Sequence, residues 1–357
     1  MRTLENRKII LIGGAGFIGH NLALRLKGLG AEVYVLDSLG VNNIYSFQKN
    51  ANAIPNAKLY LHILHQRLAL LREKKIPFVE VDSRDYDKLC QVIGDLKGDT
   101  IIHLAAVAHA NLSNKDPHST FDHSLRTLEN ALDIARNPKH GISHFIYFSS
   151  SMVYGNFTTG MVTEETLCEP LGIYGALKFS GEKIVIAYNQ VFGLPYTIVR
   201  PSALYGERCV SRRIGQIFIE NALNGLDISL NGDGSDRLDF TYIGDLVGGV
   251  VKILENENSK NQIFNLTFGA SRSISEMAVI LSEYFQGIKI TYLPKDKLMP
   301  ARGTLSVEKA QNLIGYQPQY PLEKGFVRYI EWYRTLFDKF KQTEKLPDVS
   351  SVKPIYI

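Results

Sequence analysis

A short glycine-rich turn near the N-terminus constrains the fold more than any other stretch of this chain. The stretch LIGGAGFIGH, from Leu11 to His20, directly follows the apolar run Lys8–Ile12. In a strand–turn–helix unit, the first glycine allows a tight turn, the middle one lets the backbone approach a pyrophosphate, and the last lets the helix pack on the strand. Helix-terminal N–H groups and the helix dipole favour negative charge there. Glycine-rich turns also occur for structural reasons alone, but the preceding strand favours a dinucleotide-phosphate site formed by Gly13, Gly16, Phe17, Ile18 and Gly19.

An acidic residue ends the second apolar run at the distance that such a site requires. Asp37 follows the run Glu32–Leu36 and comes about twenty residues after the glycine-rich turn. Its carboxylate would accept hydrogen bonds from the ribose hydroxyls of adenosine and would repel a 2′-phosphate. We therefore predict NAD rather than NADP as the cofactor. The alternative interpretation is that Asp37 caps a turn or a helix.

Strand-like and helix-like patterns alternate through the first half of the chain. Such alternation is typical of βαβ units, whose right-handed crossovers produce a parallel sheet covered on both faces. The chain is therefore predicted to be α/β, with a doubly wound parallel Rossmann sheet and a smaller C-terminal α/β lobe. We expect strands at Lys8–Ile12, Glu32–Leu36, Phe78–Val81, Thr100–Leu104, His144–Phe148 and Tyr196–Val199, and helices at Phe17–Lys27, Tyr86–Ile93, Pro117–Arg136 and Ile173–Phe192.

The pattern changes after about Pro201, where helical segments mix with short strands at Ile228–Leu230 and Gln262–Leu266. We expect these two strands in the smaller lobe. The connection between Ser38 and Ile76 is unusually long, and its helical periodicity predicts an extra surface helix. The predicted domains are a nucleotide-binding Rossmann domain with the catalytic residues over 1–200, a substrate-binding lobe mainly over 201–345, and a tail over 346–357.

A tyrosine and a lysine lie four residues apart in YGALK, so Tyr174 and Lys178 share one helix face. The same spacing occurs twice elsewhere, but only this pair opens a helix after a predicted sheet strand, where doubly wound folds bind ligands. That strand runs into Ser149, Ser150 and Ser151. A positive lysine and an oxidised nicotinamide lower the tyrosine pKa, so the phenolate accepts a proton while a serine holds the substrate oxygen. The set predicts hydride chemistry at an alcohol carbon; an exposed Tyr/Lys pair and a serine-rich turn are the alternatives.

Composition argues against several other classes of protein. The formal net charge is only +4 and the basic residues are scattered, so no nucleic-acid partner is indicated. The three cysteines are odd in number and far apart, which argues against a disulfide framework and a metal site. The stretch MRTLENRK lacks the apolar run of a signal peptide, and no run of eighteen apolar residues predicts a membrane span. We therefore expect a cytoplasmic protein with no membrane partner.

Several motifs together resemble a known family. The first half contains GGAGFIG, VYVLDSLG, VEVDSRD, IIHLAA, FSSSMVYG and YGALK, and the second contains RPSALYGER, LNGDGSDRLDFTYIGDL and PARGTLSVEKAQNLIGYQP. This set resembles the extended short-chain dehydrogenase/reductases that act on nucleotide sugars, and it covers nearly the whole chain. Within that family, the nearest resemblance is to the UDP-galactose 4-epimerase and UDP-glucuronate 4-epimerase branch.

The resemblance implies roles for residues at both ends of the cofactor. Tyr174 would be the base, Ser150 would hold the substrate oxygen, and Lys178 would support Tyr174 and bind the nicotinamide ribose. The remaining residues implied to contact the cofactor are Asp82 and Ser83, near the adenine, and Leu104, Ala105 and Ala106, along its length.

The resemblance also implies where the substrate binds. Ser151 is expected beside Ser150 at the sugar, and Arg237 and Arg302 at the diphosphate of a nucleotide sugar, since a guanidinium fork suits phosphate oxygens. Surface ion pairs are the alternative for both arginines. Because the family's phosphate-contacting asparagine is replaced by Ala203, further contacts are expected from Arg208 and Arg213, unless these are simply solvated charges.

The same comparison narrows the reaction. The dehydratases of this family carry an Asp-Glu pair where this chain has Ser151 and Met152, so dehydration is disfavoured. The leading hypothesis is an NAD-dependent epimerase that inverts C4 of the sugar through a 4-keto intermediate; a nucleotide-sugar 4-dehydrogenase or ketoreductase is the alternative. The nucleotide base and the sugar are left open. A homodimer is implied, through pairing of the helices expected at Pro117–Arg136 and Ile173–Phe192.

Overall fold

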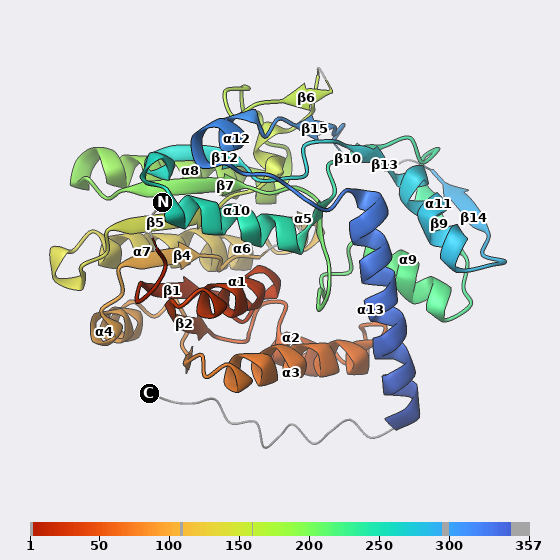
Figure 1. Cartoon of the computed structure of the whole chain (residues 1–357), viewed down its shortest axis with the longest axis horizontal. Coiled ribbons are helices and arrows are strands. Elements are labelled where there is room, and N and C mark those ends of the chain that lie inside the picture. The colour runs from red at the N-terminus through yellow and green to blue at the C-terminus, as the bar shows by residue number, and fades with distance from the viewer. Residues whose placement is uncertain (1–2, 108–109, 159, 295–299, 344–357) are drawn as a thin grey trace.

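The fold is built on one central sheet of seven parallel strands, in the order β3–β2–β1–β4–β5–β7–β12 (Figure 1). The computed structural model describes residues 3–107, 110–158, 160–294 and 300–343, so the tail predicted over 346–357 lies outside the described residues. The doubly wound parallel sheet predicted from the sequence is confirmed. Its strands are β1 (Lys8–Ile12), β2 (Glu32–Asp37), β3 (Phe78–Glu80), β4 (Thr100–His103), β5 (His144–Phe148), β7 (Tyr196–Arg200) and β12 (Gln262–Asn265).

Side chains alternate between two hydrophobic cores, one on each face of the sheet. In β1, Ile9 and Leu11 belong to one core and Ile10 and Ile12 to the other, as the two-residue period of a strand requires. All four are essentially unexposed, which explains why this strand is an uninterrupted apolar run. The strand order reverses between β1 and β4, and ligands bind at such a switch point, outside the carboxyl ends of the strands.

Helices cover both faces of the sheet. One core is completed by α1, α3 and α10 and the other by α4, α7 and α8. The extra helix predicted between β2 and β3 is present as α3. The helices of this part are α1 (Phe17–Gly28), α2 (Ile44–Lys49), α3 (Ala57–Glu73), α4 (Tyr86–Leu96), α5 (Ala110–Lys115), α6 (Pro117–Phe121), α7 (Thr127–Ala135), α8 (Gly172–Phe192), α10 (Ile243–Glu255) and α12 (Glu308–Ile314).

A smaller lobe surrounds the carboxyl ends of the strands. In the described part of this lobe there are three helices, of which α13, the long blue helix in Figure 1, packs against the other two. The helices are α9 (Ile214–Leu223), α11 (Ile274–Tyr284) and α13 (Leu322–Thr343). The short strand pairs are β8 (Leu204–Tyr205) with β11 (Thr241–Tyr242), β9 (Ile228–Asn231) with β14 (Ile290–Leu293), β10 (Arg237–Leu238) with β13 (Arg272–Ser273), and β6 (Met161–Val162) with β15 (Thr304–Leu305).

One expected strand lies in a different sheet. The run Gln262–Leu266 was expected in the smaller lobe, but β12 pairs in parallel with β7, with Ile263 opposite Ile198. The reason is the exposed edge: without β12, the backbone groups of β7 on that side would be unpaired. The domain division at residue 200 stays a prediction, and the chain beyond it contributes one strand to the central sheet.

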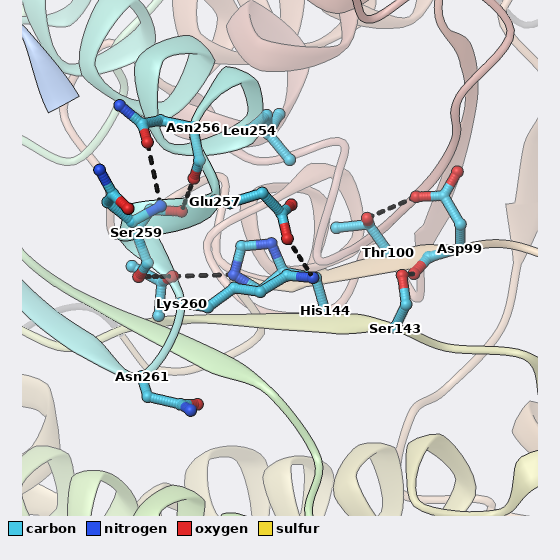
Figure 2. Close-up of polar contacts among 12 residues, drawn as sticks. Asp99, Thr100, Ser143, His144, Leu254, Asn256, Glu257, Ser259, Lys260 and Asn261 are labelled. Carbon is cyan, nitrogen blue, oxygen red and sulfur yellow. Dashed lines mark hydrogen bonds and ion pairs between the residues drawn. The ribbon is translucent and has the colours of Figure 1, made fainter. Parts of the chain in front are cut away.

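A polar cluster holds this returning segment at the amino ends of the strands (Figure 2). His144 Nε2 lies 2.8 Å from Thr197 Oγ1, and that hydroxyl donates to the Ser259 carbonyl at 2.7 Å. The hydroxyl therefore accepts from His144, which carries its proton on Nε2. Burial lowers the pKa of His144 to about 3, helped by the positive charge of Lys260, so the ring is neutral. This cluster lies at the sheet edge opposite the carboxyl ends and is structural.

No helix in the described ranges is both long enough and apolar enough to cross a membrane.

Candidate active site

The turn between β1 and α1 has the shape that a dinucleotide phosphate needs. Gly13 has φ +79°, and a Cβ there would come 2.7 Å from the backbone nitrogen of Ala105. A Cβ on Gly19 would lie 2.5 Å from the backbone of Gly14. Helix α1 begins after Gly16 with no side-chain cap and no acidic residue in its first turn. Its first N–H groups, on Phe17 and its neighbours, are therefore available to an anion, and the residues fit the phosphates of NAD.

Asp37, at the end of β2, is tied to this turn. Its Oδ2 accepts from the Ala15 N–H at 3.0 Å and its Oδ1 from the Leu39 N–H at 2.8 Å. Burial raises the pKa of Asp37 to about 6, although the two N–H donors oppose that shift. The carboxylate thus acts as a turn cap in this structure, and it lies beside the turn where an adenosine ribose is expected.

Other residues predicted at the cofactor follow β3 and β4. Leu104 donates its N–H to the Ile12 carbonyl at 2.8 Å, and Ala105 packs its backbone against Gly13, with Ala106 next in the chain. After β3, Asp82 is paired with Arg84 at 2.6 Å, and hydrogen bonding by that guanidinium lowers its pKa. The Ser83 carbonyl accepts from Asn130 Nδ2 at 2.9 Å, a contact of α7 that sequence patterns did not indicate.

The predicted catalytic side chains converge where β5 ends and α8 begins. Ser150 follows β5, and its hydroxyl lies close enough to the phenol of Tyr174, the third residue of α8, to act on the pKa of that phenol. One turn further along α8, Lys178 is 5% exposed and donates from Nζ to the Phe148 carbonyl at 2.6 Å. Burial lowers the pKa of Lys178 to about 8, and Glu182 partly opposes this. The tertiary structure therefore brings Ser150, Tyr174 and Lys178 together.

The pKa of Tyr174 is set by burial and by three neighbouring groups. We expect the charges of Lys178 and an oxidised nicotinamide together to lower the pKa of the phenol; without the nicotinamide charge, burial raises it. Three groups oppose that rise: the charge of Arg213, the hydroxyl of Ser150, and the charge of Arg302. Desolvation prevails because the phenolate would be enclosed, whereas the neutral phenol is not penalised. Two arginines of the smaller lobe, rather than the helix partner, supply the stabilising positive charge.

Arg302 approaches the catalytic side chains from the smaller lobe. Its Nη2 donates to Ser151 Oγ, and its Nη1 lies 2.8 Å from Met152 Sδ. Its buried Nε has no hydrogen-bond partner among the described residues. Burial lowers the pKa of Arg302 to about 10. A buried guanidinium with an unused donor suits an anionic ligand.

The other two predicted phosphate-binding arginines lie elsewhere. Arg237 donates to the Ser271 carbonyl at 2.6 Å and lies 3.7 Å from Glu276, which corresponds to the surface ion-pair alternative. Arg208 was expected with Arg213, but its Nε donates to His20 of α1 at 3.1 Å. Arg208 has a φ of +64°, and this left-handed turn directs the two arginines to different places.

A buried polar network behind the site was not predicted. Glu182 and Arg200 form an ion pair at 2.6 Å with side chains 1% and 3% exposed. Ser149 donates to Glu182 at 2.5 Å, and Arg200 donates to Tyr154 Oη at 2.9 Å. The network joins the carboxyl ends of β5 and β7 to α8. The only sequence signal is that Glu182 follows Lys178 by one helical turn.

A Ser–Tyr–Lys set at the carboxyl ends of this sheet order, with a glycine-rich turn at the switch point, defines an extended short-chain dehydrogenase/reductase. The chain belongs to the NAD dependent epimerase/dehydratase family, whose model matches residues 9–267. It is an NAD-dependent enzyme, and NAD is its cofactor.

Three similar proteins illustrate the relationship. The chain is 30% identical, over 92% of its length and 99% of the relative, to an uncharacterized UDP-glucose epimerase, YtcB, of Bacillus subtilis. It is 28% identical, over 92% of its length and 77% of the relative, to UDP-glucuronate 4-epimerase 1 of Arabidopsis thaliana. The crystal structure of UDP-glucuronic acid 4-epimerase from Bacillus cereus, in complex with UDP-glucuronic acid and NAD, is 25% identical with a TM-score of 0.79, covering 92% of this chain and 99% of that one.

Proposed function

We propose that this protein is a nucleotide-sugar epimerase that inverts C4 of the sugar. The observation that carries the proposal is the position of Tyr174, whose phenol lies beside the Ser150 hydroxyl and within the electrostatic reach of Arg213 and Arg302. In this proposal the phenol is the base for a hydroxyl proton, and the two arginines are the cations for a diphosphate. The similarity to a UDP-glucose epimerase and to a UDP-glucuronate 4-epimerase supports the same reaction class.

In the proposed reaction, each side chain has a separate task. Tyr174 Oη takes the proton of the sugar hydroxyl, and Ser150 holds the same oxygen by a hydrogen bond. Lys178, one turn further along α8 and held by the Phe148 carbonyl, would bind the cofactor ribose. The cofactor, when bound, would supply the acceptor and donor of the hydride at the sugar carbon, and rotation of the keto sugar between the two transfers would present its opposite face. Returning the proton from Tyr174 to the sugar oxygen then completes the inversion.

The smaller lobe is proposed to bind the substrate diphosphate. Arg302 offers its unpartnered Nε, and Arg213, at the start of α9, offers a second positive charge near it. Ser151 is held by Arg302 beside the sugar site. Neither Ser151 nor Met152 can act as a general acid, so no group at these positions can expel water from the sugar. This distinguishes the proposed epimerase from a dehydratase.

The test uses purified protein and a panel of UDP-, GDP-, dTDP- and CDP-sugars, beginning with UDP-glucose and UDP-glucuronate. Epimerisation predicts an inverted product, observed by NMR or anion-exchange chromatography, without net growth of NADH absorbance. Net NADH without an inverted product would contradict epimerisation and support the nucleotide-sugar 4-dehydrogenase alternative.

The variant Tyr174→Phe tests the base. It should lower turnover by about a hundredfold or more, because general acid–base catalysis contributes about 10²–10⁴-fold. The NAD content of the purified protein should remain unchanged, since the phenol hydroxyl is not needed to hold the dinucleotide phosphates. Full turnover in this variant would refute the assignment.

We also propose a homodimer formed through α6, α7 and α8. Large apolar side chains that are 36–71% exposed lie on α6, on α8 and at the residue before α8, namely Phe121, Ile173, Val191, Phe192 and Leu171. Exposed apolar patches of this kind mark protein–protein interfaces.

A further inference from the structure

The helix inserted between β2 and β3 buries an arginine beside the glycine-rich turn. Arg67 of α3 is 1% exposed, and within the described ranges its guanidinium forms no ion pair. Arginines are almost never fully buried unless a carboxylate pairs with them, because desolvating an isolated charge is expensive. A buried, unpaired guanidinium at a ligand-binding turn therefore calls for an anion that arrives with the ligand.

The contacts of Arg67 join three segments that are distant in sequence. Its Nε donates to the Arg208 carbonyl at 3.1 Å, and its Nη2 donates to the same oxygen. Its Nη1 lies 3.5 Å from the carbonyl oxygen of Ala15, inside the glycine-rich turn. One side chain thus fixes the turn that is expected to bind phosphate and the smaller-lobe loop that carries a second arginine.

That second arginine also reaches α1. Arg208 Nε donates to His20 Nε2 at 3.1 Å, and His20 Nδ1 lies 2.9 Å from the Gly16 carbonyl. A guanidinium can only donate and a carbonyl can only accept, so His20 is neutral with its proton on Nδ1. Burial lowers the pKa of His20, and the charges of Arg67 and Arg208 lower it further. The positive charge of this cluster therefore belongs to the two arginines.

The opposing groups are Cys209 and Asp37 beside Arg67, and Glu207 beside Arg208. Burial raises the pKa of the Cys209 thiol, and Glu207 already pairs with Arg328 at 2.9 Å. Asp37 interacts electrostatically with Arg67, but its carboxylate is committed to two backbone N–H groups, and burial raises its pKa to about 6. The cluster around the turn thus holds an excess of positive charge next to the open N–H groups of α1. Helix N-termini of this kind bind phosphates, and nearby guanidinium groups add to that attraction.

We propose that Arg67, together with Arg208, is a determinant of dinucleotide binding in this chain: it clamps the glycine-rich turn and supplies counter-charge to the pyrophosphate of the cofactor. The inference concerns the NAD site alone and needs no assumption about the sugar. It assigns the inserted α3 a role in binding, in addition to packing.

The test compares a ligand that has the diphosphate with one that lacks it. Titration calorimetry of the full-length protein, freed of co-purified nucleotide, gives the affinities for ADP and for adenosine. In Arg67→Met, the ratio of ADP to adenosine affinity should fall at least tenfold, while adenosine affinity changes less than twofold. In Arg67→Lys, which keeps the charge, the ratio of ADP to adenosine affinity should lie between those of the wild type and Arg67→Met. Arg72→Met, an exposed arginine on the same helix, should leave the ratio unchanged.

An unchanged ratio in Arg67→Met, or an equal loss for both ligands, would overturn the proposal, because a purely structural role does not distinguish phosphate from ribose. If Arg67→Met does not fold, Arg208→Gln carries the test, with a fall in the ratio expected and an unchanged ratio contradicting it. Neither measurement uses a sugar substrate. A negative result would therefore count against the role of Arg67 and would say nothing about the epimerase proposal.

Discussion

At the scale of single residues, the site depends on charges that are held away from water. Glu182 shows this most clearly, because it neutralises Arg200, accepts from Ser149 and opposes the desolvation of Lys178. Losing that one carboxylate affects the stability of the protein and the protonation of the lysine together.

The variant Glu182→Gln should lower the free energy of unfolding by about 3–5 kcal/mol, because it leaves a buried arginine uncompensated. Urea denaturation followed by circular dichroism measures this. The control is Glu255→Gln, which removes a partly exposed pair with Lys252 at 3.3 Å and should change stability by less than about 1 kcal/mol. If both variants changed the free energy of unfolding by the same amount, the buried ion pair would contribute no more to stability than the partly exposed one.

A second residue-scale prediction concerns the pH dependence of NAD binding. The pKa of Asp37 is raised from 3.8 to about 6, so in the free protein its contribution to stability is present below about pH 4 and is lost as pH rises through 6. The pH dependence of NAD binding has the opposite sign to that of stability, since ribose hydroxyls donate to the ionised carboxylate and binding therefore favours the deprotonated form. NAD affinity should therefore fall as pH drops below about 6, by at most about tenfold per pH unit.

Titration of NAD between pH 5 and pH 8 measures this dependence. In Asp37→Asn the affinity should be weaker and should lose its dependence on pH in that range. A wild-type affinity that is flat from pH 5 to pH 7 would exclude Asp37 as the ribose acceptor.

The sequence predicts those parts of the site whose residues lie close together in the chain. Tyr174 and Lys178 lie one helical turn apart, and the glycines lie in one turn, so their spacing together with the predicted strand before each motif identifies them. Glu182 and Arg200 come from different elements, and nothing in their spacing indicates a pair. The contact of Arg208 with His20 joins residues 188 positions apart, and a left-handed backbone at Arg208 sets its direction. Tertiary contacts of this kind have no local pattern.

At the scale of elements, a glycine of the β1–α1 turn, Gly13, and the last residue of α1, Gly28, make a matched pair. Gly13→Ala places a Cβ 2.7 Å from the Ala105 backbone at a positive φ, so it should lower stability by about 1–3 kcal/mol and reduce the NAD content of the purified protein. Gly28→Ala, at the end of the same helix, meets nothing within 4 Å and should be neutral or stabilising by up to about 1 kcal/mol. Thermal unfolding and nucleotide analysis of both variants check this; equal NAD content in the two would contradict it.

Element boundaries were predictable where an apolar period continued to the end of the element. The strands at 8–12 and 144–148 match their predicted ranges, and α3 was expected from its periodicity. The helix expected over Pro117–Arg136 instead contains a π-helical turn at Asp122–Arg126, between α6 and α7. The π-helical segment is only five residues long, which is too short for a periodicity argument to detect.

At the scale of the whole molecule, assembly can be tested by light scattering. The wild-type protein should have twice the mass of one chain. The double variant Phe121→Asp/Val191→Asp should reduce this to one chain, since it places charges on the apolar surface of α6 and α8. Leu226→Asp, at a comparably exposed position in the smaller lobe, should leave the dimer intact. A wild-type monomer would contradict the proposed interface.

The sequence predicted the assignment of strands to the two lobes least well, because β12 was expected in the smaller lobe and pairs with β7 in the central sheet. A short run such as QIFNL carries no information about which sheet it joins, because both sheets accept the same residue types. Only the open edge of β7 decides it, and that edge exists only in the assembled fold.

The position of β12 also matters while the ribosome is still making the chain. About sixty residues separate the end of β7 from the start of β12, and at roughly 5–20 residues per second their synthesis takes several seconds. Throughout that interval the backbone groups at one edge of the nascent sheet are unpaired, and they can pair with other nascent chains on the same messenger RNA. Translation speed across this stretch, and early chaperone contact, should therefore govern how much newly made protein reaches its native form.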